Sequence, residues 1–172
     1  MCGIAGILAS QPASLSMIGP MTRAQAHRGP DGEGFAFIGP DGHAHISTQA
    51  DHAHPSQIAL GHRRLAILDT SDAGLQPMAS ADGDHVICYN GEVYNYIELR
   101  DELSALGHIF RTGTDTEVVL AAYGEWNVDA FARFYGMWAL AIWDRCRQVL
   151  VLSRDRFGVK PLHVAHENGA LL

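Results

Sequence analysis

Short apolar runs, each bounded by turn-forming residues, recur along the whole chain and constrain its fold more than any other feature. The first run covers residues 3–9, and a Gly-Pro-Asp-Gly turn separates the next two, at 34–38 and 43–48. A similar hairpin-like pair lies at 137–143 and 149–153. Runs of this kind with turn signals between them are typical of β-strands. Because only a few helical patterns separate them, the sequence predicts an α+β fold built as a sandwich of sheets.

Helical patterns and further strands account for much of the remaining chain. Apolar residues recur at helical spacing over 94–106, and Gly107 follows as a C-cap. Other helices are expected at 20–27, 115–123 and 128–134, other strands at 58–68, 85–89 and 170–172, and an extended segment at 75–78. The 172 residues contain no internal repeat or linker, and their 47% hydrophobic content is enough for a full core. We therefore expect a single domain over residues 1–172.

Charge and cysteine content disfavour several classes of protein. The chain has 12 basic and 19 acidic residues, a net charge of −7, and no basic run longer than Arg63-Arg64, so nucleic acid and anionic membranes are poor partners. The sequence lacks an apolar stretch of about 18 residues and a secretion signal, so we expect no membrane association. Cys88 is expected to be buried and inert and Cys146 to be exposed. The few, irregularly spaced cysteines favour a reduced, cytoplasmic setting.

Cys2 begins a glycine-spaced apolar run, directly after Met1. If Met1 is removed, Cys2 carries a thiol and a free α-amine on the same residue. The amine titrates near about pH 8 and the thiol near about pH 8.5. The amine can therefore act as general base for its own thiol, without a histidine. Taken alone, Cys2 is either an accident of the translation start or a self-contained nucleophile.

Two polar clusters interrupt apolar runs, and each has a functional and a structural interpretation. Arg63-Arg64 lies within a strand-like segment, where two adjacent charges indicate one inward-facing guanidinium that could bind a carboxylate, or a break in the strand. A solvated strand edge is the structural alternative. Asn90-Gly91-Glu92 ends a strand and offers a side-chain amide and an unhindered N–H, the donors that an oxyanion hole requires. An ordinary Asn-Gly turn is the simpler interpretation, but a helical pattern follows where a turn predicts a second strand.

Three further clusters are ambiguous from the sequence alone. Asp115 begins a helical pattern, where helix capping is the simpler interpretation and pairing with a substrate ammonium is the alternative. Residues 154–162 alternate charge and glycine, as in a surface ion-pair turn or a loop that docks on another domain. Two His-x-His pairs lie in one loop region, at His43, His45, His52 and His54. A solvated hairpin is favoured over a transition-metal site for these histidines.

Seven motifs together resemble one family in both order and spacing. They lie at 1–6 (Met-Cys-Gly-Ile-Ala-Gly), 27–32 (His-Arg-Gly-Pro-Asp-Gly), 64–69, 76–78 (Gln-Pro-Met), 89–95 (Tyr-Asn-Gly-Glu-Val-Tyr-Asn), 113–117 and 154–162 (Arg-Asp-Arg-Phe-Gly-Val-Lys-Pro-Leu). The set resembles the class II glutamine amidotransferase domain, and most closely the glutamine-hydrolysing asparagine synthetase subfamily. The resemblance covers almost the whole chain. His163 departs from it, because the family usually has tyrosine there, and we interpret this change as tolerable packing.

The resemblance implies the four-layer αββα sandwich of N-terminal-nucleophile hydrolases. It makes Cys2 the nucleophile, with its freed amine as base, and makes Asn90 and the Gly91 N–H the oxyanion donors. The glutamine-binding residues that it implies are Arg64 for the α-carboxylate, Asp115 and Glu92 for the α-ammonium, and the backbone of Leu65, Ala66, Ile67 and Leu68. The resemblance implies no metal ligand in this domain.

The resemblance also implies partners beyond this chain. In the family, ammonia from L-glutamine passes to a C-terminal synthetase domain, where ATP with magnesium activates aspartate. The sequence has no Ser-Gly-Gly-x-Asp-Ser loop, so we expect a C-terminally truncated glutaminase domain without a cofactor or, less favoured, a stand-alone glutaminase. The alternatives are an amidotransferase for another carboxylate acceptor and, if Met1 is retained, a non-catalytic glutamine-binding module. The oligomeric state stays open, with a homodimer as one option.

Overall fold

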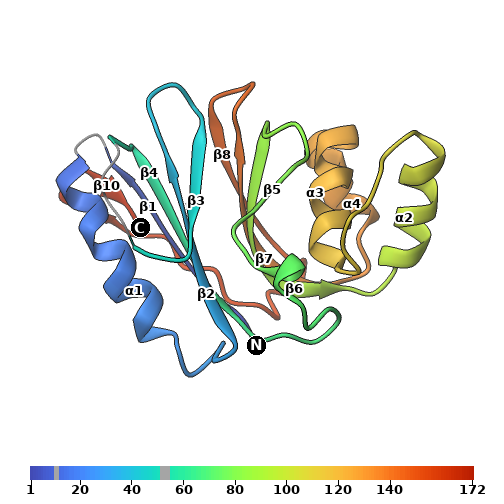
Figure 1. Ribbon diagram of the computed structural model, residues 1–172, viewed down its shortest axis with the longest axis horizontal. Coiled ribbons are helices and arrows are strands. Elements are labelled where there is room, and N and C mark those ends of the chain that lie inside the picture. The colour runs from blue at the N-terminus through green and yellow to red at the C-terminus, as the bar shows by residue number, and fades with distance from the viewer. Residues whose placement is uncertain (10–11, 51–54) are drawn as a thin grey trace.

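The computed structural model describes residues 1–9, 12–50 and 55–172, which form four layers (Figure 1). Helix α1 (Ile18–Ala24) is one outer layer and follows a 3₁₀ segment, Pro12–Met17. Two antiparallel sheets form the middle layers of the described part. The other outer layer contains α2 (Tyr96–Ala105), α3 (Asp115–Trp126) and α4 (Ala130–Arg133). The order of the layers confirms the predicted αββα sandwich.

In the described residues the first sheet has six strands, in the order β3-β2-β4-β1-β10-β9, and the second has four, in the order β5-β6-β7-β8. The first contains β1 (Gly3–Ala9), β2 (Gly32–Ile38), β3 (Ala44–Ser47), β4 (Ile58–Arg64), β9 (His166–Glu167) and β10 (Ala170–Leu171). The second contains β5 (Met78–Ala79), β6 (His85–Val93), β7 (Gly136–Asp144) and β8 (Val149–Arg154). Further 3₁₀ segments lie at Asp72–Gly74 and Asn127–Asp129.

Apolar clusters fill the spaces between the layers and explain why the strand sequences are so uniformly apolar. On β2, Phe37 packs in the cluster beneath α1, whereas its neighbour Ile38 faces the second sheet. On β6, Ile87 packs in the cluster beneath the helices, whereas Cys88 faces the first sheet. Successive side chains of a strand point to opposite faces, and here both faces are covered. A strand covered on both faces therefore carries apolar residues at consecutive positions over most of its length.

The same alternation determines which polar side chains reach the space between the sheets. Leu60 of β4 belongs to the cluster between the two sheets, so His62 and Arg64, two and four residues further on, point to the same face. Arg63 points to the opposite face. On β6 the corresponding position after Cys88 is Asn90.

The predicted hairpins at 34–48 and 137–153 and the C-terminal strand are confirmed, and two strand ends differ from the prediction. β4 ends at Arg64 and not at residue 68, because the next two N–H groups bond to side chains, Leu65 to Cys2 Sγ and Ala66 to Asp31. β6 continues through residues 90–93, which pair with β7. The helix expected at 20–27 begins and ends earlier, at Ile18–Ala24.

Of the helices described, none has the length and apolar character needed to cross a membrane.

Candidate active site

A pocket with a cavity volume of about 80 Å³ opens where β1 begins, β4 ends and β6 runs past the end of β5. All but one of the predicted site residues line it. The residues that line it are Cys2, Arg64, Leu65, Ile67, Leu68, Asn90, Gly91, Glu92 and Asp115. Ala66 is the exception, and its N–H donates to Asp31 Oδ2 at 2.9 Å. The structure thus brings together residues that are more than 100 positions apart in the sequence.

Cys2 lies immediately before β1, and both its backbone and its side chain form hydrogen bonds. Its carbonyl oxygen accepts a hydrogen bond from Arg28 Nε at 3.1 Å, and the Leu65 N–H donates to its Sγ at 3.4 Å. Burial raises the pKa of the Cys2 thiol, while the bond from Leu65 and the nearby positive charge of Arg64 act in the opposite direction. The sulfur therefore lies at the pocket wall beside an N–H donor, and its hydrogen-bond partners among the described residues include no histidine.

Arg64 is the last residue of β4, and its guanidinium faces the pocket because of strand alternation. It donates to the Ser71 carbonyl at 2.6 Å and to the Asp69 carbonyl. Gly74 leaves room for this group, since a Cβ there would collide with the guanidinium. Arg63 points away and bonds Glu33 Oε2 at 2.8 Å. Of the two adjacent arginines, only Arg64 lines the pocket.

Asn90 and Gly91 lie within β6, beyond the point where β5 ends. The N–H and C=O groups of alternate strand residues point to the same edge. Ile87 is opposite Met78 of β5, the Tyr89 N–H donates to Gln76 Oε1 at 2.7 Å, and the Val93 N–H donates to Asp115 Oδ2 at 3.0 Å. This alternation directs the Gly91 N–H to the same edge, toward the pocket that Gly91 lines.

Asp115 is in the first turn of α3 but does not cap the helix. The N-cap is Thr114, whose hydroxyl accepts from the Glu117 N–H at 3.3 Å. The Asp115 side chain, 6% exposed, instead accepts from the Tyr89 hydroxyl at 2.9 Å and from Val93. Burial raises the pKa of Asp115 against these hydrogen bonds, which lower it. The half-buried Glu92 lines the same pocket.

A family model described as "Glutamine amidotransferase domain" matches residues 1–172. The chain belongs to the glutamine amidotransferase domain family. Asparagine synthetase [glutamine-hydrolyzing] 1 of Bacillus subtilis (strain 168) is 38% identical over 168 residues, which cover 95% of the amidotransferase domain and 24% of that relative. Putative asparagine synthetase [glutamine-hydrolyzing] 2 of Methanocaldococcus jannaschii is also 38% identical, over 95% of this domain and 32% of that relative. The chain therefore spans between a quarter and a third of the length of these relatives.

The fold of the amidotransferase domain is also found in a solved structure. Glutamine phosphoribosylpyrophosphate amidotransferase from B. subtilis superposes with a TM-score of 0.77 at 20% sequence identity, over 99% of this chain and 41% of that one. At this level of identity the likeness establishes the architecture. It supports the αββα sandwich that the motifs predicted.

Several residues of the amidotransferase domain contribute to the site without a role predicted from the sequence. Arg28 belongs to a recognised motif, and its bond to the Cys2 carbonyl spans 26 positions of the chain. Gln76 bonds the Tyr89 N–H and Thr116. Lys160 is 5% exposed, lines the pocket and places Nζ 3.2 Å from Met1 Sδ. Motif membership was the only available signal for these three residues.

The motif at 154–162 forms a loop of the amidotransferase domain around one buried carboxylate. Asp155 Oδ1 accepts from the N–H groups of Phe157 and Val159 at 3.1 and 2.9 Å, and Oδ2 accepts from that of Lys160 at 3.0 Å. These bonds hold Lys160 at the pocket, whereas the Phe157 side chain is 91% exposed. The carboxylate thus organises backbone N–H groups, which differs from the surface ion-pair turn considered from the sequence.

The remaining histidines and cysteines that the structure of the amidotransferase domain describes do not line this pocket. His43 and His45 are in or beside β3, and His52 and His54 lie outside the described residues. Across the parts of the chain that the structure describes, no three His, Cys, Asp or Glu side chains are arranged to hold a metal ion. Cys88 is fully buried, where burial raises the pKa of its thiol, and Cys146 is exposed, as predicted.

Proposed function

We propose that this domain hydrolyses L-glutamine to glutamate and ammonia, with Cys2 as the nucleophile. The observation that carries the proposal is that one pocket combines Cys2 with a buried cation, Arg64, and a buried anion, Asp115. A free amino acid has a carboxylate and an ammonium at one end, so it matches a pair of opposite charges. Membership of the amidotransferase domain family supports the same conclusion.

Glutamine binds through charges at its α-carbon and is hydrolysed at its side chain. Arg64 binds the α-carboxylate, while Asp115 and Glu92 bind the α-ammonium. Leu65, Ile67 and Leu68 contribute further to the lining of the same pocket. A simple amide lacks both charges, which explains why glutamine is selected. Ammonium binding also compensates Asp115 for its burial, because an ion pair favours the charged carboxylate.

Hydrolysis then proceeds in two steps through a thioester. The α-amine of Cys2 takes the thiol proton, and the thiolate attacks the side-chain amide carbon. Asn90 and the Gly91 N–H stabilise the oxyanion, the amine returns the proton to the leaving nitrogen, and ammonia departs. Water, deprotonated by the same amine, attacks the γ-glutamyl thioester through a second oxyanion, releasing glutamate and the Cys2 thiol.

Removal of Met1 is a condition of this mechanism. While Met1 is present, the nitrogen of Cys2 is an amide and cannot accept a proton. Met1 also lines the pocket and contacts Lys160 there. A chain that retains Met1 corresponds to the alternative function, a glutamine-binding module without catalysis.

The ammonia is used by a synthetase domain that amidates aspartate with ATP and magnesium, in the same polypeptide or in a separate one. Two relatives named glutamine-hydrolysing asparagine synthetases support this acceptor. Because the chain spans only a part of their length, another carboxylate acceptor is the second candidate. The residues of this domain do not supply the ATP chemistry, and the setting we propose is the cytoplasm.

Glutamate release from glutamine tests the proposed hydrolysis. Cys2→Ser should abolish it, and Asn90→Ala should lower the rate about 10²–10³-fold, the usual loss for one oxyanion donor. Cys146→Ser, which changes an exposed thiol outside the pocket, is the matched control and should retain full activity. Intact-mass measurement establishes that the assayed chain begins at Cys2. Normal activity in Asn90→Ala, or in Cys2→Ser, would contradict the proposal.

A further inference from the structure

Two hydrogen bonds join the sheets across the interior, next to the pocket. Cys88 Sγ donates to the Gly61 carbonyl at 3.3 Å, and His62 Nε2 lies 3.1 Å from the Tyr89 carbonyl. The two bonds link adjacent residues of β4 to adjacent residues of β6. His62 is two residues before Arg64, and Tyr89 is the residue before Asn90. The cross-link therefore lies between the strand end that supplies the guanidinium and the strand segment that supplies the oxyanion donors.

Tyr89 requires this bond because of its place on β6. β5 pairs with β6 only at Val86 and Ile87, so the backbone groups of Tyr89 lie just past its end. Gln76 accepts from the Tyr89 N–H, and His62 bonds the Tyr89 carbonyl. These two side chains make the hydrogen bonds to the Tyr89 backbone that a neighbouring strand would otherwise make. The next residue on the same edge is Gly91, whose N–H is directed to the pocket.

The His62 ring makes this contact in one protonation state and at an energetic disadvantage. A carbonyl can only accept, so Nε2 carries the proton and Nδ1 is an acceptor. Nδ1 is buried and has no hydrogen-bond partner in the described structure, and the residue is fully enclosed. Burial lowers the pKa of His62 to about 4, so the ring is neutral near pH 7. An unsatisfied buried acceptor is unfavourable, and an apolar side chain would avoid it.

We propose that His62 is a positioning residue for glutamine hydrolysis, whose Nε2–H holds the Tyr89 carbonyl and thereby fixes Asn90 and Gly91 relative to Cys2 and Arg64. The inference rests on the proposed function, because the residues it positions are the proposed oxyanion donors. Without the bond, the carbonyl of the peptide between Tyr89 and Asn90 has no side-chain hydrogen-bond partner among the residues that the structure describes. The oxyanion donors then lose their alignment.

This role affects the rate more than substrate binding. Arg64 keeps its bonds to the Ser71 and Asp69 carbonyls, and Asp115 keeps its bond from the Val93 N–H. Oxyanion stabilisation acts in the transition state, so its loss lowers kcat and changes KM little. A purely structural role for His62 predicts instead a loss that follows the folded fraction.

The test compares His62→Met with His62→Gln in glutamate release by the whole chain. Gln places an N–H donor near the position of Nε2, whereas Met has similar bulk and no donor. His62→Met should lower kcat about 10–100-fold, short of the full loss of an oxyanion donor, with KM within about threefold. His62→Gln should restore most of the rate. If circular dichroism shows that His62→Met is unfolded, His62→Asn, whose amide is too short to reach Tyr89, replaces it with the same expectation.

Two outcomes overturn the inference. One is an unchanged kcat in the folded variant that lacks the donor. The other is an equal loss in the Met and Gln variants that follows their melting temperatures, which indicates packing alone. Failure of the proposed function is a separate result, since the unsubstituted chain beginning at Cys2 would then release no glutamate.

Discussion

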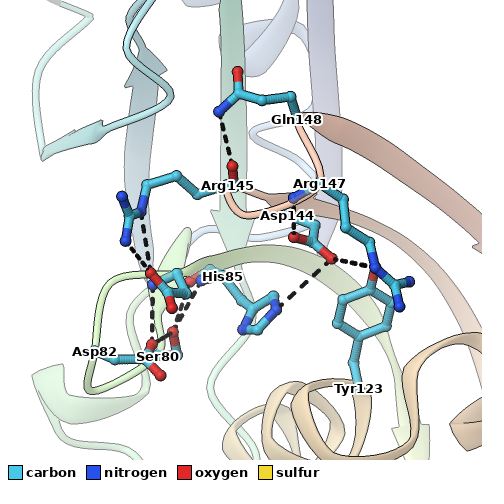
Figure 2. Close-up of polar contacts among 9 residues, drawn as sticks. Ser80, Asp82, His85, Tyr123, Asp144, Arg145, Arg147 and Gln148 are labelled. Atoms are coloured by element: carbon cyan, nitrogen blue, oxygen red, sulfur yellow. Dashed lines mark hydrogen bonds and ion pairs between the residues drawn. The ribbon is translucent and has the colours of Figure 1, made fainter.

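The two ends of β6 each place a buried aspartate beside a tyrosine hydroxyl, and the two sites differ in one respect. At the pocket end, Tyr89 donates to Asp115 at 2.9 Å. At the opposite end, Tyr123 donates to Asp144 at 3.0 Å (Figure 2). The carboxylates are 6% and 3% exposed. Burial raises the pKa of both hydroxyls, that of Tyr123 to about 12, so both tyrosines act as protonated donors near pH 7.

Among the described residues, only Asp144 has basic side chains within ion-pair distance, those of Arg147 and His85. Figure 2 shows His85, Tyr123 and Arg147 pointing toward Asp144. His85 Nε2 lies 3.9 Å and Arg147 Nε 3.8 Å from Asp144 Oδ2, and the Arg147 N–H donates to Oδ1 at 2.9 Å. The ion pairs found in the described residues include none with Asp115.

This difference is what the proposed binding role of Asp115 and a structural role of Asp144 predict. Asp144 is the last residue of β7, opposite His85, and its charge is balanced within the chain. Asp115 lines an open pocket and accepts hydrogen bonds from Tyr89 and Val93, but it forms no ion pair within the described residues. A buried charge without a counter-ion is unfavourable unless a ligand supplies one. Under the proposed function, the ammonium of glutamine supplies this counter-charge to Asp115, whereas Asp144 has an ion-pair partner within the chain, Arg147.

The largest expected effect is on activity. Asp115→Asn should lower kcat/KM for glutamine by about 100-fold or more, mainly through KM, because the ammonium loses its buried counter-charge. Asp144→Asn should leave kcat/KM within about twofold, since it lies at the far end of β6 and outside the pocket. Steady-state glutamate release measures both. Equal losses in the two variants would remove the distinction between the carboxylates.

The second effect, on stability, has opposite signs at the two sites. Asp144→Asn should lower the free energy of unfolding by about 2 kcal/mol, because bonds to a charged group are lost. Asp115→Asn should raise it by about 1 kcal/mol, as is common when a strained functional residue is neutralised. Urea denaturation at pH 7 measures both values.

The gain for Asp115→Asn should depend on pH. The pKa of Asp115 is raised in the folded state, so folding is favoured by protonation below the unfolded pKa, and this contribution disappears as pH rises through the folded pKa. The variant should therefore match the unsubstituted chain near pH 3.5 and exceed it at pH 7. A gain that is the same at both pH values would contradict the burial argument.

The smallest expected effect comes from removing the tyrosine hydroxyls. Tyr89→Phe should raise KM for glutamine about 3–10-fold, because Asp115 loses a donor that orients it. Tyr123→Phe should cost about 1 kcal/mol of stability with unchanged kinetics, because Asp144 keeps its bond from the Arg147 N–H. Paired kinetic and denaturation measurements check this. A shift of KM in Tyr123→Phe would show that the two ends of β6 are coupled.

Strand alternation and motif order allowed much of the fold and site to be predicted. The apolar runs predicted the layered sheets, and alternation explains why only one of Arg63 and Arg64 faces the pocket. From the sequence, the simpler interpretation of Asp115 was a helix N-cap or a first-turn acid. Thr114 is the N-cap, and Asp115 lies in the first turn of α3. Asn90 was expected at the end of a strand, but β6 continues because residues 90–93 pair with β7.

Contacts between distant elements could not be predicted. The bond from Arg28 to Cys2 and the bond from His62 to Tyr89 depend on the register of strands far apart in the sequence. No local pattern contains that register. The early end of β4 has the same origin, since Leu65 leaves the sheet to bond Cys2 Sγ.

Whole-protein mass spectrometry after incubation with a diazoketone analogue of glutamine tests the central claim most directly. The analogue carries the α-carboxylate and α-ammonium of glutamine, so it needs the Arg64 and Asp115 ends of the pocket as well as a reactive thiol. The account predicts one adduct per chain, on Cys2 of chains that lack Met1, and none after Cys2→Ala or when excess glutamine is present. An adduct on Cys146, or equal labelling of chains that retain Met1, would contradict it.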